Sequence, residues 1–86
     1  MLKIGDKVFP ISKSIGKPLD DSYTHLKLKE DKKQFLTIIY IENKNQPIYH
    51  CSIDINESNF CDFYLEKDLI SKNKYILNIL KGNKNE

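Results

Sequence analysis

The sequence contains no arginine, alanine or tryptophan, so all fourteen of its basic residues are lysines. Arginine binds carboxylates, phosphates and guanine bases through paired hydrogen bonds, whereas lysine offers only a hydrated point charge. The absence of arginine therefore argues against sequence-specific reading of DNA. Asn, Lys and Ile are abundant instead, which suggests an AT-rich coding sequence of a low-GC bacterium or its mobile elements.

Long hydrophobic runs are also absent. Charges at Lys3 and Asp6 interrupt the first residues before an apolar segment can form, so no signal peptide is predicted. No apolar run approaches the roughly 18 residues that a membrane-spanning helix needs. We therefore expect a cytoplasmic protein without membrane contact, in which Cys51 and Cys61 are reduced thiols.

The length of 86 residues leaves room for one hydrophobic core. We expect a single domain over residues 1–82 and a disordered tail over 83–86. The net charge of +2 is unevenly spread, because residues 34–70 carry two lysines against six acids while both flanking segments are basic. This pattern is either ordinary solvated charge or an acidic face offered to a basic partner.

Alternating and β-branched segments predict a mainly β fold. Residues 34–42 are apolar on both faces and should form the central strand. Residues 12–22 collect turn-forming side chains and are expected to be a long loop. The first strand is entered through a Gly-Asp turn, and a partial alternation after the long loop is typical of a half-exposed strand. In chain order, strands are expected at residues 8–11, 23–30, 34–42, 48–55 and 60–65.

The last two of these strands should form a hairpin whose register can be judged from side-chain alternation. Pairing about the centre of the loop puts Cys51 opposite Cys61 and Tyr49 opposite Phe63. Apolar side chains then share one face and mostly polar side chains the other, which favours this register. The inward set is Tyr49, Cys51, Ile53, Cys61, Phe63 and Leu65, and the outward set is His50, Ser52, Asp54, Asp62, Tyr64 and Glu66.

After Leu65 the apolar spacing changes to that of a helix, which predicts a short C-terminal α-helix. Ser71 is expected to cap its N-terminus and Gly82 its C-terminus. The side chains predicted to share one side of the helical wheel are Leu69, Ile70, Ile76, Leu77 and Leu80.

Two short motifs bracket the predicted strands: Leu-Lys-Ile-Gly-Asp-Lys-Val at residues 2–8 and Phe-Tyr-Leu-Glu-Lys-Asp-Leu-Ile at residues 63–70. This order resembles the small SH3-like β-barrels of KOW type in short bacterial and phage proteins. The resemblance covers residues 2–70 and implies a five-stranded barrel, closed by a short helical turn at Glu66–Leu69. The long segment 12–33 and the C-terminal helix depart from that pattern. Such barrels imply binding to a protein or nucleic acid more often than catalysis.

The cysteines and histidines offer little for catalysis or metal binding. His50 and Cys51 are adjacent on a strand and point to opposite faces, and no CxxC or HxxxH pair exists. We interpret Cys51 and Cys61 as core thiols, with a cross-strand disulfide and a metal site as alternatives. No paired acid site or calcium-loop spacing is present either. We therefore expect no enzymatic activity, no metal and no cofactor.

Two sets of residues are candidates for a binding surface. Aromatic side chains beside acids are typical of protein interfaces, unless the aromatics pack beneath the C-terminal helix. Lysines beside a tyrosine could bind nucleic acid, unless they form a solvated strand edge. The protein-binding set is Tyr40, Asp54, Phe60, Asp62, Tyr64 and Glu66; the nucleic-acid-binding set is Tyr23, Lys27, Lys29, Lys32 and Lys33.

These observations predict a non-catalytic binding or adaptor module, of the kind found among accessory proteins of phages and plasmids. It would dock on another protein and could inhibit it by offering the acidic middle of the chain to a basic cleft. The alternative is a lysine-based nucleic-acid-binding protein with little sequence preference, whose affinity would fall steeply with salt.

Overall fold

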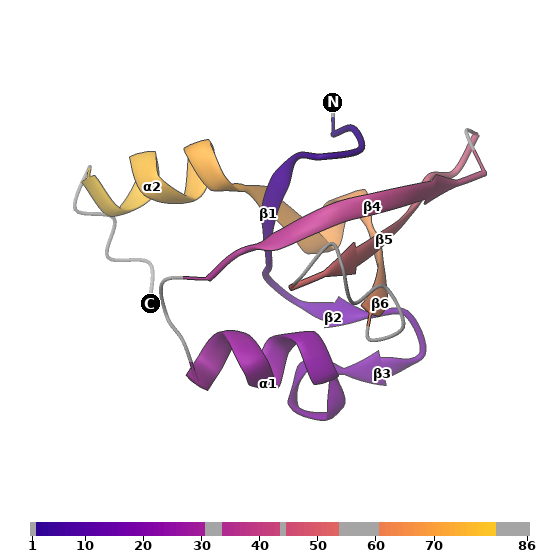
Figure 1. The fold of residues 1–86 in the computed structure, drawn as a ribbon, viewed down its shortest axis with the longest axis horizontal. Coiled ribbons are helices and arrows are strands. Elements are labelled where there is room, and N and C mark those ends of the chain that lie inside the picture. Colours follow the sequence, from indigo (N-terminus) through magenta and orange to yellow (C-terminus); the bar gives the residue numbers. More distant parts are fainter. Residues whose placement is uncertain (1, 31–33, 44, 54–60, 81–86) are drawn as a thin grey trace.

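The computed structural model describes residues 2–30, 34–43, 45–53 and 61–80 (Figure 1). More of these residues lie in strands than in helices, so the fold is mainly β, as predicted. The predicted Gly82 cap and the tail at 83–86 lie outside the described residues. The elements are β1 (Lys7–Pro10), β2 (Lys13–Ser14), β3 (Lys17–Pro18), η1 (Leu19–Asp21), α1 (Tyr23–Glu30), β4 (Leu36–Glu42), β5 (Ile48–Ser52), β6 (Cys61–Leu65), η2 (Glu66–Asp68), β7 (Leu69–Ser71) and α2 (Lys72–Leu80).

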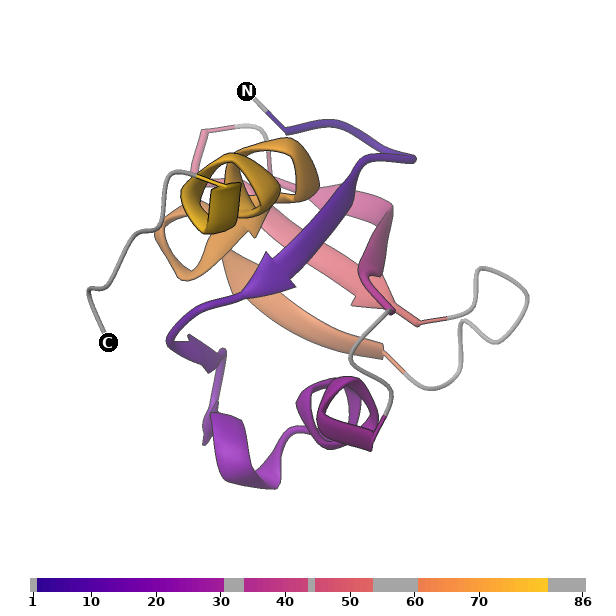
Figure 2. The ribbon, with the colours of Figure 1, turned by 90° about the vertical axis from the view of Figure 1, so that its left-hand side faces the viewer.

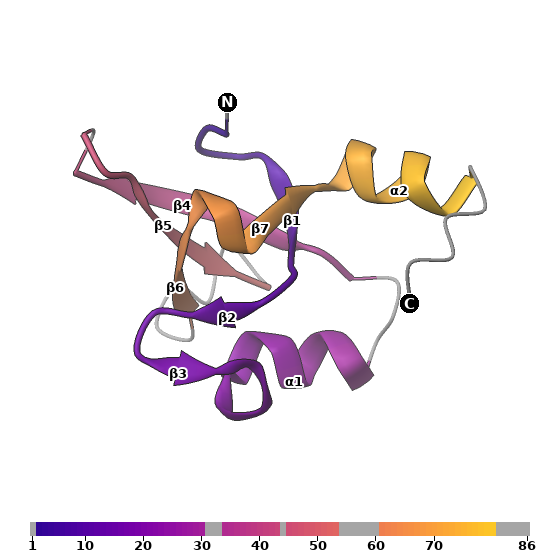
Figure 3. The same ribbon diagram turned by 180° about the vertical axis from the view of Figure 1, so that it is seen from behind.

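Five strands form one antiparallel sheet in the order β6-β5-β4-β1-β7, with β4 in the middle as predicted. The strands β2 and β3 form a separate hairpin beside β6, where the Ile15 N–H donates to the Phe63 carbonyl over 2.7 Å (Figure 3). Within the described part of the chain, no strand pairing joins β6 to β7. The sheet is therefore five-stranded and antiparallel, and the expected closed barrel is not found.

The predicted Gly-Asp turn leads into β1. Gly5 has a φ of +94°, which a glycine adopts without steric cost, and its N–H donates to the Ile38 carbonyl over 2.8 Å. Asp6 closes the turn, because its carboxylate accepts from the Lys3 N–H over 3.0 Å. The turn thus aligns the start of β1 with β4.

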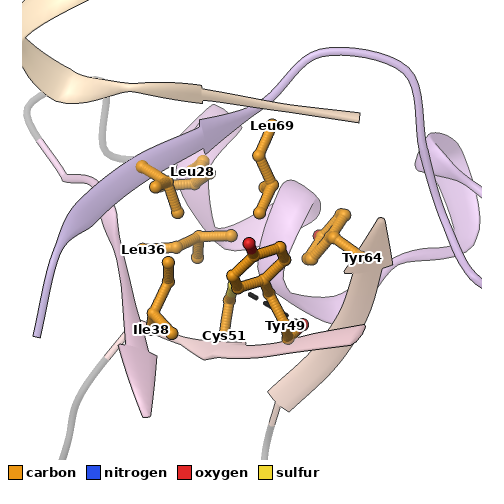
Figure 4. Packing of buried hydrophobic residues seen from close by; sticks show 8 residues of the cluster. Leu28, Leu36, Ile38, Tyr49, Cys51, Tyr64 and Leu69 are labelled. Carbon is orange, nitrogen blue, oxygen red and sulfur yellow. Dashed lines mark hydrogen bonds between the residues drawn. The ribbon is translucent and has the colours of Figure 1, made fainter. Parts of the chain in front are cut away.

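The core lies on one face of the sheet and is closed by Leu28 of α1 (Figure 4). The strand β4 contributes to it on both sides of a bulge, because the pairing with β5 shifts between Ile38 and Tyr40. The extra residue lets both Ile38 and Ile41 pack with the core while Tyr40 points outward. The buried apolar side chains are Val8, Leu28, Leu36, Ile38, Tyr49, Cys51, Tyr64 and Leu69.

The segment from residue 12 to residue 30 differs from its prediction. Residues 23–30 were expected to be a strand, but they form the helix α1, in which Thr24 and Leu28 are buried at helical spacing and Leu26 is exposed. The expected loop at residues 12–22 contains the hairpin β2-β3 and the turn η1. Contacts made by the start of α1 with β6, described below, explain why the helix forms.

The predicted register of the β5-β6 hairpin is wrong by one residue. In the structure Tyr49 pairs with Tyr64, Cys51 with Asp62, and Ser52 with Cys61. A slip of one residue exchanges the two faces of a strand. Asp62 and Tyr64 therefore point into the molecule, and Phe63 points outward.

The predicted C-terminal helix is present as α2, and Ser71 caps it by accepting from the Lys74 N–H over 3.2 Å. Leu69 and Ile70, expected on the helical face, belong instead to β7. Tyr75 attaches α2 to the body, because its ring stacks on Phe9 at 4.7 Å and meets Phe35 edge-on at 5.6 Å. No residue of α2 is buried, and Figures 1 and 3 show the helix projecting from one end of the sheet.

Candidate binding surface

A buried polar network joins the start of α1 to β6. Its centre is Asp62, which is 2% exposed. The Asp62 Oδ2 atom accepts from the Ser22 hydroxyl at 2.6 Å, from the Thr24 hydroxyl at 2.7 Å and from the Thr24 N–H at 2.9 Å. The Oδ1 atom lies 3.0 Å from the Lys17 ammonium on β3. The carboxylate thus connects β6 to β3 and to the start of α1, which lie some forty residues earlier in the chain.

The number of available protons fixes the direction of each hydrogen bond in this network. Ser22 and Thr24 each have one hydroxyl proton, and both donate it to Asp62. The Tyr64 hydroxyl, which lies 2.7 Å from Thr24 Oγ1, must therefore be the donor to that atom. Ser22 also caps α1, because its Oγ accepts from the His25 N–H over 3.2 Å.

This environment changes the acidity of both β6 side chains. Burial raises the pKa of Asp62, but the hydrogen bonds from Ser22, Thr24 and Lys17 outweigh burial, so the net pKa lies below its ordinary value. Burial raises the pKa of Tyr64 to about 12, and the charge of Asp62 acts in the same direction. Near neutral pH, Asp62 is an anion and Tyr64 is a neutral donor.

The network stabilises the fold and does not form a reactive site. Ser22 and Thr24 donate to a carboxylate, as an activated nucleophile would. However, both hydroxyls, together with Asp62 and Tyr64, are buried to 2% exposure or less, so no substrate atom can reach them. The negative charge of Asp62 at the first turn of α1 also interacts favourably with the helix dipole, which stabilises the helix. Asp62 therefore holds α1 against the sheet.

The opposite face of β4, β5 and β6 carries a row of aromatic rings. Tyr40 pairs with His50, and His50 pairs with Phe63, so the three side chains occupy one line across three strands. Tyr40 is 54% exposed and Phe63 is 41% exposed. We call Tyr40, His50 and Phe63 the aromatic row.

The rings of the aromatic row hold one another in place. Tyr40 and His50 meet edge-on with centroids 5.1 Å apart, and His50 and Phe63 are tilted at 4.5 Å. Cross-strand ring pairs of this kind contribute roughly 0.5–1.5 kcal/mol beyond burial of area. Glu42 adds a 2.9 Å contact from its carboxylate to His50 Nε2. The row is therefore a pre-ordered apolar surface that loses little side-chain freedom when it binds a partner.

The predicted protein-binding set does not come together as one surface. Tyr40 is exposed on the sheet, and Glu66 is exposed in η2, where it lies 3.5 Å from the Tyr49 hydroxyl. Asp62 and Tyr64 were expected on the outer face, but they are buried in the network under α1. Asp54 and Phe60 lie outside the described residues. His50 was correctly placed outward, and Phe63 was missed because its face depends on the hairpin register.

Three of the five residues in the predicted nucleic-acid-binding set belong to α1, which is a helix and not the expected strand, and Lys29 lies on a different side of it from Tyr23 and Lys27. The Lys27 ammonium lies 5.6 Å from the centre of the Tyr23 ring and 3.6 Å from the Glu30 carboxylate. Lys29 is exposed near the end of the same helix. Lys32 and Lys33 lie outside the described residues. Because α1 contacts the inward side chains of β6, this group lies on the other side of the sheet from Phe63.

Cys51 and Cys61 are free thiols that do not face each other across the hairpin. Burial raises the pKa of both, most strongly at Cys51 in the core, so neither thiol resembles a reactive thiolate. No group of three or more His, Cys, Asp and Glu side chains in the described ranges could hold a metal ion.

The sequence matches no family model, and it shows no significant similarity to a curated protein or to a solved structure. None of the helices in the described part of the chain is long and apolar enough to cross a membrane.

Proposed function

We propose that this protein is a small SH3-like barrel protein that acts as a non-catalytic binding module and docks on another protein through the aromatic row. The strand order β6-β5-β4-β1-β7 and the short helical turn at Glu66–Asp68 support the SH3-like part of this proposal. The turn lies where the family resemblance implied one. The exposed aromatic row supports the proposal that the protein binds a partner.

The aromatic row leaves apolar area in water that a docked partner would bury. Tyr and Phe side chains bury large apolar areas at interfaces, at about 25 cal/mol per Å² removed from water. Internal packing accounts for the contacts between the rings, but Tyr40 and Phe63 still expose about half of their surface. Glu42 and His50 supply polar groups beside this apolar centre, which is the usual arrangement of a protein interface.

The proposal can be tested with a double variant, Tyr40→Ser with Phe63→Ser. The tagged wild-type protein should retain one stoichiometric protein from a low-GC bacterial lysate treated with nuclease, and the double variant should lose it. Mass spectrometry of the retained material gives the readout. The variant loses both ring pairs with His50, so the thermal unfolding transition should fall by roughly 5–20 °C but stay cooperative, and the retention experiment is done well below it.

A matched control is the variant Lys27→Ser, which removes the exposed lysine that lies beside Tyr23 on α1. This control should retain the same partner. Loss of the partner in the lysine variant, with retention in the aromatic variant, would place the interface on α1 and refute the proposed one.

A second candidate function, sequence-tolerant nucleic-acid binding, is favoured by the Tyr23–Lys27 pair, since a tyrosine beside lysines is a stacking platform for unpaired bases. Omitting the nuclease from the same experiment separates the two functions. Material that is retained only without nuclease, and lost in the lysine variant, would support nucleic-acid binding.

A further inference from the structure

An apolar pocket opens between the two helices. It has a volume of about 230 Å³ and is lined by Phe9 of β1, Leu28 and Lys29 of α1, and Tyr75 of α2. Figure 2, which views both helices nearly end-on, places α2 above α1 with β1 between them. The pocket is smaller than the roughly 300–1,000 Å³ of typical small-molecule sites, and its size suits a single large apolar side chain.

The helix α2 extends this pocket with aliphatic side chains. Ile79 lies one turn beyond Tyr75 on the same side of the helix and is 59% exposed. Leu80 is 74% exposed, and Ile76 and Leu77 are also exposed. An α-helix normally turns its apolar side chains toward the body, whereas α2 contacts the body mainly through Tyr75. The pocket and Ile79 form what we call the interhelical groove.

The described charged side chains bordering the interhelical groove are positive. Lys29 lines the pocket, and the Lys72 ammonium lies 5.4 Å from the centre of the Phe35 ring, beside Tyr75. The sequence of α2 contains two lysines and no acid. The one acid of α1, Glu30, lies 3.6 Å from Lys27. A ligand of the groove therefore needs negative charge at its edges.

Two occupants from the same protein fit this chemistry poorly. Residues 81–86, Lys-Gly-Asn-Lys-Asn-Glu, contain no apolar side chain that could fill the pocket. The helix α2 of a second copy has suitable aliphatic residues, but it would bring its own Lys72 and Lys74 toward Lys29 and Lys72. Like charges placed opposite one another across an interface cost several kcal/mol.

We propose that the interhelical groove binds an acidic amphipathic helix of a partner protein. The partner would insert one large apolar side chain between Phe9, Leu28 and Tyr75, cover Ile79, and place carboxylates against Lys29 and Lys72. This helix-in-groove mode uses apolar anchors at helical spacing for affinity and charge for orientation. The interface goes beyond the proposed function, because none of its residues belongs to the aromatic row.

The test is a display selection against the whole immobilised protein, using a library of amphipathic helical peptides. Their flanking positions should be randomised without bias toward either charge. The proposal predicts that the enriched peptides carry a large apolar residue on one face and net negative flanks. Their binding should shift the amide NMR signals of Leu28, Lys29, Tyr75 and Ile79 and leave those of the aromatic row in place.

Charge reversal provides the decisive comparison for the best enriched peptide. Lys29→Glu with Lys72→Glu should weaken binding about tenfold or more, and replacing the peptide's glutamates by lysines should restore it. Lys13→Glu with Lys67→Glu changes the net charge equally at other exposed sites and should have a much smaller effect. Ile79→Ser changes an exposed side chain, so it should reduce affinity without unfolding the protein.

Several results would overturn the proposal. They include a selection that enriches no peptide, one that enriches uncharged or basic peptides, and binding that Ile79→Ser leaves unchanged. Two further measurements test other occupants. If the whole protein binds phosphatidylglycerol vesicles and no peptide, and Ile79→Ser abolishes vesicle binding, α2 would be assigned to a membrane surface. Concentration-dependent dimers in sedimentation that disappear in Ile79→Ser would assign the groove to a second copy.

Discussion

At the scale of single residues, Asp62 is the side chain whose structural role is least visible in the sequence. From the sequence it is one of several acids in the middle of the chain, and it was expected to face solvent. Its true position depends on donors from Lys17, Ser22 and Thr24, which lie some forty residues earlier. Local patterns carry no information about contacts at that separation, so the network could not be predicted.

Replacing Asp62 by Asn should lower the free energy of unfolding by about 2–4 kcal/mol. The carboxamide keeps the shape but presents an NH₂ group where several donors need an acceptor, and buried groups left unsatisfied are costly. Urea unfolding measures the change. Glu42→Gln is the matched control, because Glu42 is exposed and its removal should cost no more than about 0.5–1 kcal/mol.

The variant Asp62→Asn also tests how the stability of the protein depends on pH. Since the folded-state pKa of Asp62 lies below the unfolded value of about 3.9, its contribution is complete above that pH. The contribution is lost as the pH falls through the folded-state pKa. The difference between wild type and Asp62→Asn should therefore shrink on acidification below about pH 4. A difference that stays constant to the lowest pH would mean that the charge of Asp62 does not contribute.

At the scale of elements, β1, β4, β5 and β6 of the central sheet could be predicted, but β7 could not, and the pairing of the strands was predicted only in part. The apolar run at residues 36–42 identified β4, and the turn formers after it identified the β4-β5 hairpin, where Asn43 adopts a φ of 60°. The register of β6 was misjudged because Phe63 and Tyr64 are both aromatic, so alternation alone allows either one inside. The helix α1 was missed because Leu26 and Leu28 mimic the spacing of a strand.

Two serine caps allow the role of tertiary contacts in the helices to be measured. Ser22→Ala removes both the cap of α1 and a hydrogen bond to Asp62, so it should cost about 2–3 kcal/mol and reduce hydrogen-exchange protection of the α1 amides. Ser71→Ala removes only the cap of α2, with an expected cost of about 1 kcal/mol and faster exchange in α2 alone. Unchanged protection of α1 in Ser22→Ala would show that other contacts hold this helix.

At the scale of the whole molecule, the sheet separates two candidate surfaces. The aromatic row lies on the outer face of β4, β5 and β6, and the interhelical groove lies at the end where α1 and α2 meet β1. The sequence predicted a binding module without locating either surface correctly. Locating the aromatic row required the register of the β5-β6 hairpin. Locating the interhelical groove required the positions of two helices that are distant in sequence. Both surfaces require the same intact core.

The thiol of Cys51 should report on the cooperativity of that core. Cys51 is fully buried in β5, and burial raises its pKa, so a thiol reagent at neutral pH should reach it only after global unfolding. In a Cys61→Ser background, the opening free energy from Cys51 labelling should equal the unfolding free energy from urea titration, within about 1 kcal/mol. Adding Asp62→Asn should lower both free energies by the same amount.

Cys61 is partly exposed, so in a Cys51→Ser protein its labelling should require a smaller opening free energy. Labelling of Cys51 well below the global free energy would reveal that β6 detaches from β5 as a separate unit, and the aromatic row would then form and dissolve with it.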